Sequence, residues 1–297
     1  MVVGQLPAET VKEFSVDLPR RKAIGWFFIG LGFLSISFGL FMLLLLLFDV
    51  FSRGLPYLTW DFLTSFDSRF PQRAGILAAL AGTVYMMGFT IIAALPLGVA
   101  AAIYLEEYAG DSWFARLVEI NISNLASVPS IIYGLLGLQL FVRAMGLNRS
   151  VLAGALTMAL VILPIIIVAS REALRAVPPS IRDASLALGA TKWQTIRHHV
   201  LPYALSGIMT GNILAAARAI GESAPLIAIG ALTFVPFTPN SPLDLFTVLP
   251  IQIFNWTSRP QEAFHDVAAA GIIVLLTVLL VLNSLAIFLR WRFRTQF

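Results

Sequence analysis

The feature that most constrains this chain is a set of long apolar stretches without charge. Residues 24–48 carry no charged side chain and end in a run of leucines. About 20 apolar residues in a helix are enough to cross the hydrocarbon core of a bilayer. Over the whole chain 58% of residues are hydrophobic and 12% are charged, whereas soluble domains carry about 25% charged residues. The sequence therefore predicts an all-α integral membrane protein.

Six membrane-spanning helices account for the apolar stretches. The first stretch is too long for the apolar core of a secretory signal, and no small-residue cleavage site follows it. Pro96 predicts a kink near the end of the second stretch, and Pro129 lies in the first half of the third. The predicted spans are 24–48, 76–104, 121–142, 151–170, one that begins near 203, and 268–289.

The distribution of lysine and arginine orients these spans. With the N-terminus inside, thirteen of these residues fall in inner segments and six in outer ones. Because such an excess marks cytoplasmic loops, we expect both termini in the cytoplasm. Three arginines in the outer loop 49–75 run against this bias. The net charge of +4 is explained by loop orientation, so we do not expect nucleic-acid binding.

The fifth apolar region, residues 203–235, is too long for one helix. At 1.5 Å per residue it would rise roughly 50 Å, whereas the hydrocarbon core is about 30 Å thick. Gly221 and Pro225 predict a break, followed by a broken or re-entrant piece. Irregular backbone at that depth needs protein or water beside it.

Two charged residues, Arg218 and Glu222, lie at this break. A helical spacing of four places them on one face, one turn apart. Unit charges about 4 Å apart attract by about 4 kcal/mol at an effective dielectric constant of about 20. This attraction offsets an insertion cost of roughly 2.5–3.5 kcal/mol for one charge at mid-membrane. We therefore expect a mutually neutral pair that faces protein or a pathway.

An amphipathic, basic segment, residues 171–202, connects the fourth and fifth spans. Ser180 can cap a helix that has Asp183 at its third position. Gly189 can end this helix, and a second helix can begin near Thr191. Two short helices of this kind fit either a docking element in the cytoplasm or an interfacial helix on the inner leaflet. The pattern by itself favours neither.

This segment resembles the EAA loop of binding-protein-dependent ABC importer permeases, which favours the docking element. The family pattern is Glu-Ala-Ala, three residues, Gly, nine residues, Ile, one residue, Leu-Pro. Here aspartate replaces glutamate, serine replaces the second alanine, and histidine stands where isoleucine is usual. The glycine and Leu-Pro spacing is intact. The matching residues are Asp183, Ala184, Ser185, Gly189, Leu201 and Pro202.

Further stretches resemble the phosphate-specific branch of this family. They are LPLGVAAAIYLEEYA (95–109), LASVPSIIYGLLGL (125–138), LGATKWQTI (188–196) and RAIGESAPL (218–226). A fifth stretch, LPIQIFNWTSRPQEAFHDVAAAG (249–271), is similar to the A-type subunit rather than to its C-type sister. The resemblance covers roughly residues 75–290.

The resemblance implies a fold with six transmembrane helices, in which a permease core like that of the methionine importer carries a cytoplasmic coupling loop. The chain then divides into a cytoplasmic tail 1–23, a first span with its outer loop 24–74, a permease domain 75–290 that contains the coupling loop 171–202, and a cytoplasmic tail 291–297.

It also implies a function, as one subunit of an ATP-driven importer of inorganic phosphate in the bacterial inner membrane. The expected partners are a C-type permease that forms the other half of the pathway, a dimeric cytoplasmic ATPase, an extracytoplasmic phosphate-binding protein and membrane lipids. The sequence has no G-x-x-x-x-G-K-[ST] phosphate loop. We therefore expect no enzymatic activity and no cofactor in this chain, with ATP bound by the partner ATPase.

Two alternatives to a phosphate importer remain open. The nearest is a permease for another oxyanion, namely molybdate, sulfate or phosphonate. An ion-coupled carrier or channel, which would need no ATPase, is more distant, because the chain carries a docking-type loop and lacks detectable inverted repeats.

In a phosphate importer Arg218 is a candidate for a transient substrate contact, because a guanidinium can hold phosphate bidentately. Glu222 would compete for the guanidinium and so keep binding weak enough for release. Ser223 can add a hydroxyl to this pathway site. The structural alternative is that the charged pair ties this helix to the partner permease or caps its broken end.

Several other polar and aromatic residues receive structural interpretations. Glu106 and Glu107 are interpreted as a solvated helix end, and Trp256 and Trp291 as interfacial anchors. The chain has no cysteine and three histidines without helical metal-ligand spacing. We therefore expect no metal site.

Overall fold

The computed structural model describes residues 18–110, 112–231 and 234–292, and within these ranges the regular elements are helices. The chain divides into two units, residues 1–49 and 50–297. The described part of the first unit belongs to α1 (Leu18–Gly54), which continues into the second unit. The two predicted cytoplasmic tails lie mostly outside the described residues.

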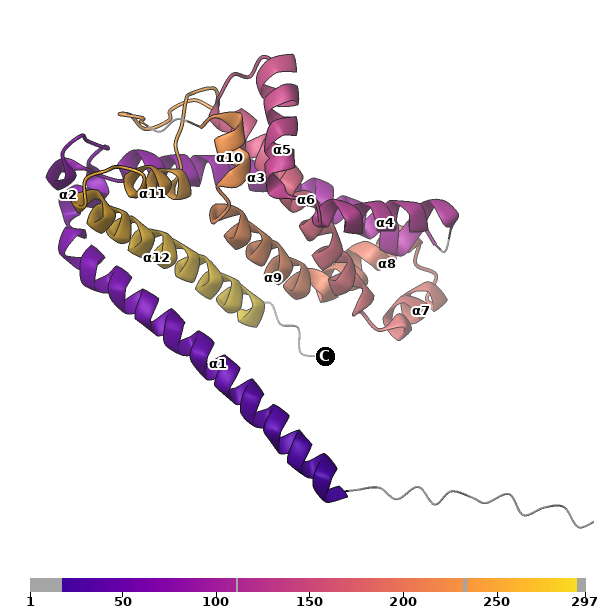
Figure 1. Ribbon diagram of the computed structural model, residues 1–297. Helices are drawn as coiled ribbons and strands as arrows, with labels where there is room; N and C mark the ends of the chain where they lie inside the picture. Colours follow the sequence, from indigo (N-terminus) through magenta and orange to yellow (C-terminus); the bar gives the residue numbers. More distant parts are fainter. Residues whose placement is uncertain (1–17, 111, 232–233, 293–297) are drawn as a thin grey trace, which may run out of the picture. The chain divides into compact units, whose positions relative to one another are not determined.

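Four long helices form the core of the second unit (Figure 1). The second of them, α6, packs along both α3 and α9, and α9 also packs along α12. Buried apolar side chains such as Met86, Met158 and Ile162 fill the space between them. The bounds are α3 Leu77–Ile103, α6 Val151–Arg175, α9 Leu201–Ile220 and α12 Ala263–Arg292.

Small residues let α6 and α9 approach each other closely. Gly207 and Gly211 on α9 face Ala173 and Ala169 on α6. A Cβ atom added at these glycines would lie 2.8 and 2.6 Å from the alanine Cβ atoms. Helices in membranes associate through close packing because no water is expelled between them, and small residues four apart permit it. The Gly207-x-x-x-Gly211 spacing therefore sets the approach of these two helices.

Five helical stretches are long and apolar enough to cross a membrane, and a bent pair of helices raises the number to six if it counts as one span. These stretches contain the predicted first, fourth and sixth spans, all but the first residue of the second, and most of the fifth. They are Leu18–Tyr57, Leu77–Tyr108, Val151–Arg175, Lys192–Ile220 and Ala263–Trp291.

The prediction of a single helix over residues 121–142 is wrong. This region falls on α4 (Trp113–Ala126) and on α5 (Ser130–Gly137), which continues into the π-helix η4 (Leu138–Ala144). The two pieces are bent by 98°. Proline disfavours helical backbone in the residue before it, so Pro129 ends one helix and precedes the next. The hydroxyl of Tyr133 donates to the carbonyl oxygen of Leu125 at 2.8 Å across the bend.

The fifth span begins earlier than the predicted residue 203. The short helix α8 (Lys192–Thr195), the π-helix η5 (Ile196–Val200) and α9 follow one another without interruption. The second short helix of the EAA loop is therefore continuous with the span. The predicted break is confirmed, because α9 ends at Ile220 and α10 (Ala224–Ile229) begins after three intervening residues, with a proline in its first turn.

The interpretation of Trp256 as an interfacial anchor is wrong. Trp256 lies on α11 (Leu249–Thr257), is fully buried, and donates from its ring nitrogen to Asp67 at 2.8 Å. Arg259 donates to the other carboxylate oxygen of Asp67 at 2.5 Å. This cluster ties the segment before α3 to the one before α12. The remaining short helices there are η1 (Leu55–Tyr57), α2 (Trp60–Thr64) and η2 (Pro71–Arg73).

Candidate functional site

Two interrupted helices meet at the candidate pathway site. The break between α4 and α5 and the break between α9 and α10 are joined by a hydrogen bond, in which the hydroxyl of Ser130 donates to Glu222 at 2.7 Å. Just beyond, α5 packs on α10, and a Cβ atom at Gly134 would lie 2.6 Å from the Cα atom of Pro225. Irregular backbone within a membrane is tolerated beside protein or a water-filled cavity. Two such segments at one place are therefore a candidate pathway.

The expected pairing of Arg218 with Glu222 is not formed. The helix α9 ends at Ile220, so the one-turn geometry that a continuous helix would give is lost at Gly221. Glu222 is half-buried and bonded to Ser130, whereas Arg218 is exposed. Within the described residues the guanidinium of Arg218 makes no ion pair or side-chain hydrogen bond. The site thus holds a free guanidinium beside a restrained carboxylate.

Ser223 occupies the residue before α10. Its hydroxyl does not cap the helix, and its carbonyl oxygen accepts from the backbone amides of Leu226 and Ile227 at 3.1 and 3.0 Å. The half-buried hydroxyl is therefore not used by the helix that follows it. Arg218, Glu222 and Ser223 lie within one break, and Ser130 completes the site from a segment about ninety residues away in sequence.

The EAA loop folds as two helices joined by a tight turn, as predicted. The first is α7 (Pro179–Ala187) and the second is α8, whose cap residue Thr191 forms a capping box with Gln194. Between them Gly189 adopts a φ of +83°, the left-handed conformation that costs glycine least. The expected cap at Ser180 is wrong, because the helix already begins at Pro179, whose ring presets φ for a first helical position.

The predicted coupling residues divide between two faces of this loop. Asp183 and Ala184 are exposed, beside a group of apolar side chains that are also exposed. Ser185 is instead buried, and its hydroxyl lies 2.9 Å from that of Thr195, so it holds α7 against α8. Leu201 is half-buried and Pro202 exposed at the start of α9. The exposed apolar group consists of Leu186, Leu188 and Trp193.

Ion pairs anchor the EAA loop, which makes the interpretation of Glu106 and Glu107 as a solvated helix end wrong. Both lie on the π-helix η3 (Tyr104–Tyr108) that continues α3. The side chain of Glu107 is 7% exposed and accepts from Arg182 at 2.7 Å. Arg182 also donates to the carbonyl oxygens of Val177 and Leu174 at 2.7 and 2.9 Å. The guanidinium thus supplies donors to carbonyl oxygens in the last turn of α6 and just after it, where helical hydrogen bonds run out.

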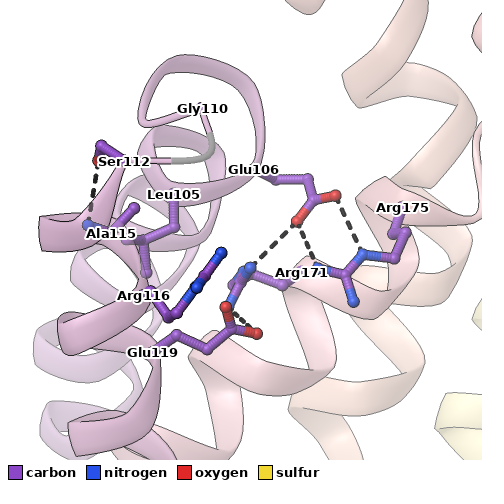
Figure 2. A pocket seen from close by; sticks show the side chains of 9 residues that line it. All are labelled: Leu105, Glu106, Gly110, Ser112, Ala115, Arg116, Glu119, Arg171 and Arg175. Atoms are coloured by element: carbon purple, nitrogen blue, oxygen red, sulfur yellow. Dashed lines mark hydrogen bonds and ion pairs between the residues drawn. The ribbon is translucent and has the colours of Figure 1, made fainter.

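Glu106 joins the end of α3 to the end of α6 in the same way. It accepts from Arg175 at 3.1 Å and from Arg171 at 3.4 Å, and Arg171 also contacts Glu119 of α4 at 3.1 Å. Figure 2 shows Arg171 between the two carboxylates. The partners lie on different helices and far apart in sequence, so no local pattern identifies them. The only signal was the presence of two glutamates and several arginines in segments predicted to lie on the same side of the membrane.

The fold and the loop define a class of protein. Residues 94–294 match the family of the binding-protein-dependent transport system inner membrane component. Since the match covers more than half of the chain, the chain belongs to this family of transport permeases. A solved structure of the MetNI methionine ABC transporter has the same fold, with a TM-score of 0.59 over 75% of this chain and 95% of that one, at 20% identity. The predicted fold class and family are confirmed.

Relatives that match most of the chain include phosphate permeases. The phosphate transport system permease protein PstA of Haemophilus influenzae is 34% identical over 264 residues, which cover 89% of this chain and 92% of the relative. The protein of the same name from Yersinia pestis is 33% identical over 275 residues, covering 90% of this chain and 92% of the relative. These similarities extend along nearly the whole chain, including both interrupted helices and the EAA loop.

Proposed function

We propose that this chain is one membrane-spanning permease subunit of an ATP-driven importer of inorganic phosphate. The observation that carries the proposal is the near full-length similarity to phosphate permeases from two organisms. The exposed apolar group on the EAA loop supports the dependence on a partner ATPase, because exposed large apolar patches mark interaction sites. The chain itself contributes half of the pathway and neither binds nor hydrolyses ATP.

The remaining partners and the orientation follow from this role. A C-type permease completes the pathway, an extracytoplasmic binding protein delivers phosphate, and a dimeric ATPase docks on the EAA loop. That loop and both termini lie in the cytoplasm of a bacterium, as the distribution of lysine and arginine favours. ATP-driven closure of the ATPase moves α7 and α8 as a rigid body, and the helices continuous with them follow.

The pathway site takes its chemistry from Arg218. A guanidinium without a carboxylate partner costs roughly 2.5–3.5 kcal/mol at mid-membrane on the insertion scale, so it faces the pathway rather than lipid. It contacts phosphate transiently, and the hydroxyl of Ser223 adds a donor. Glu222 is the competitor that limits how tightly phosphate is held. Its hydrogen bond to Ser130 keeps the carboxylate off the guanidinium in this state.

The test is uptake by the reconstituted complex. We expect proteoliposomes that contain this chain, its partners and enclosed ATP to accumulate labelled phosphate when the binding protein is added. Excess unlabelled phosphate should compete, whereas sulfate, molybdate and phosphonate should not. A partner ATPase inactivated in its phosphate loop is the matched control. Uptake that persists with this control would instead indicate an ion-coupled carrier, and equal competition by another oxyanion would reassign the substrate.

A further inference from the structure

A polar cavity opens at the end of the molecule where the EAA loop lies. Its volume is about 230 Å³, and the share of one water molecule in the liquid is about 30 Å³. The walls come from the first turns of α4, from η3 and from the last turns of α6 (Figure 2). The charged residues of the lining are Glu106, Arg116, Glu119, Arg171 and Arg175.

Among the residues that the structure describes, the lining holds more arginine than carboxylate. Three guanidinium groups face two carboxylates, and Figure 2 shows Arg116 extending toward Arg171. Arg175 also contacts Glu172, a residue outside the cavity, at 3.6 Å. Within the described residues Arg116 makes no ion pair or side-chain hydrogen bond. The Nε atom of Arg171 is buried and likewise has no hydrogen-bond partner. The described lining therefore carries one more arginine than carboxylate, and it has unused donors.

The same turns of α4 carry a face suited to lipid. Trp113 is 77% exposed, Phe114 lies beside it in an edge-to-face contact, and both are followed by exposed Leu117 and Ile120. Tryptophan gathers where the hydrocarbon meets the headgroups of a membrane. An exposed face of this composition suits a first turn of α4 that lies at headgroup depth. Arg116, on the adjoining face, then lies within reach of lipid phosphates.

We infer that this cavity binds the phosphate group of an anionic phospholipid between Arg116 and Arg171. A phosphate oxygen accepts from arginine in short charge-assisted hydrogen bonds, and basic pockets between membrane helices on the cytoplasmic side suit anionic headgroups. A bound headgroup would join the start of α4 to the end of α6, beside the ion pairs that hold the EAA loop. Free inorganic phosphate offers the same chemistry from another source. The inference does not depend on which solute the importer carries.

The experiment measures protection of a thiol inside the cavity. The sequence has no cysteine, so Ala115→Cys gives this subunit one thiol in the lining. The assembled complex is placed in nanodiscs of phosphatidylcholine alone or mixed with phosphatidylglycerol, and a neutral maleimide is added. A third arm adds inorganic phosphate to the phosphatidylcholine discs. The reaction rate at the thiol is read from the mass of this subunit as lipid or phosphate is titrated.

The result expected is that phosphatidylglycerol slows the reaction and that Arg116→Ala weakens this protection about fivefold, the effect of about 1 kcal/mol per basic residue near anionic lipid. Because Arg116 makes no ion pair with the described residues, its removal leaves the ion pairs of Arg171 and Arg175 intact. Arg197→Ala is the matched control, since Arg197 is exposed on η5 outside the cavity. Protection by inorganic phosphate alone, with the same dependence on Arg116, would support the site and assign the free anion. Equal rates with and without Arg116 in every arm would overturn the inference.

Discussion

Arg218 and Glu222 are four residues apart, yet the structure gives them different surroundings. Arg218 is exposed at the last turn of α9, whereas Glu222 is held by Ser130 across the break. If the two residues formed a buried ion pair, substituting either one would have a similar effect, because the remaining charge would be left without a partner. Because the two side chains have different surroundings, we expect substitutions of Arg218 and of Glu222 to have different effects.

We expect Arg218→Ala to lower phosphate uptake per assembled complex by about ten- to one-hundredfold, since hydrogen bonds to charged groups contribute about 1.5–3 kcal/mol. Assembly should be unchanged because the side chain makes no ion pair or hydrogen bond with the part of this subunit that the structure describes. Uptake is measured in proteoliposomes against the amount of complex recovered. Full transport by Arg218→Ala at normal assembly would remove Arg218 from the pathway.

Glu222→Gln should act differently, because it removes the competing charge but keeps an oxygen that can accept from Ser130. The guanidinium of Arg218 then holds phosphate longer, so turnover should fall more than apparent affinity. The control combines Arg218→Ala with Glu222→Gln. If the two residues were only a structural tie, the combination would restore assembly and transport. For a transport site assembly is normal in each variant, and the combination should not restore transport.

Gly189 offers a test of the EAA loop that depends on backbone conformation alone. A Cβ atom at this position would meet nothing within 4 Å, so only the φ of +83° opposes substitution. Gly189→Val should therefore uncouple ATP hydrolysis from uptake while the protein stays in the membrane, because a β-branched residue is strained there. Gly189→Asn is the matched control, since asparagine tolerates this conformation. Equal coupling in both variants and the wild type would contradict the assignment of the turn.

At the scale of elements, the prolines show which helix breaks can be predicted from the sequence and which cannot. Pro96 and Pro164 lie inside the continuous helices α3 and α6, whereas Pro129 and Pro225 stand at the start of new ones. All four prolines lie in apolar stretches of the sequence. The neighbouring residues do not distinguish a proline inside a continuous helix from one that begins a new helix. The break near Pro225 was predictable because the stretch was too long for the bilayer. The bend before α5 was not, because its stretch had the length of one span.

The ion pair between Arg182 and Glu107 holds α7 against the π-helix η3 at the end of α3. Removing one member of a buried ion pair costs about 3–5 kcal/mol, because the other charge is left without a partner. Arg182→Gln should therefore lower the melting temperature of the complex and weaken coupling. Combining it with Glu107→Gln should recover most of the melting temperature. Arg197→Gln, an exposed control in the same loop, should have little effect. Failure of the double variant to recover would show that the pair acts through other groups.

At the scale of the molecule, contacts between distant segments decide where residues lie. Asp67 and Trp256 are about 190 positions apart, and their hydrogen bond buries a tryptophan that composition places at the membrane surface. The ion pair between Asp67 and Arg259 cannot be predicted from either segment alone, because it forms only when the two segments fold together. The family, the long helices and the coupling turn were predictable because their signals are local. The interaction partners Ser130, Glu107 and Asp67 were not predictable, because each contacts a residue that lies far away in the sequence.

Orientation in the membrane is the property of the whole molecule that most needs a direct measurement. Single cysteines are unique labels in this chain because it has none of its own. Arg197 and Gln261 are suitable positions, since both are exposed, whereas replacing Arg259 would break its contact with Asp67. We expect a membrane-impermeant thiol reagent to modify Arg197→Cys only in inside-out vesicles and Gln261→Cys only in right-side-out vesicles, because the side richer in lysine and arginine stays in the cytoplasm. Modification of both from one side would require an even number of crossings between them and would exclude the six-span arrangement. Modification with both sides exchanged would leave the helices in place but put the EAA loop outside, where no ATPase could reach it.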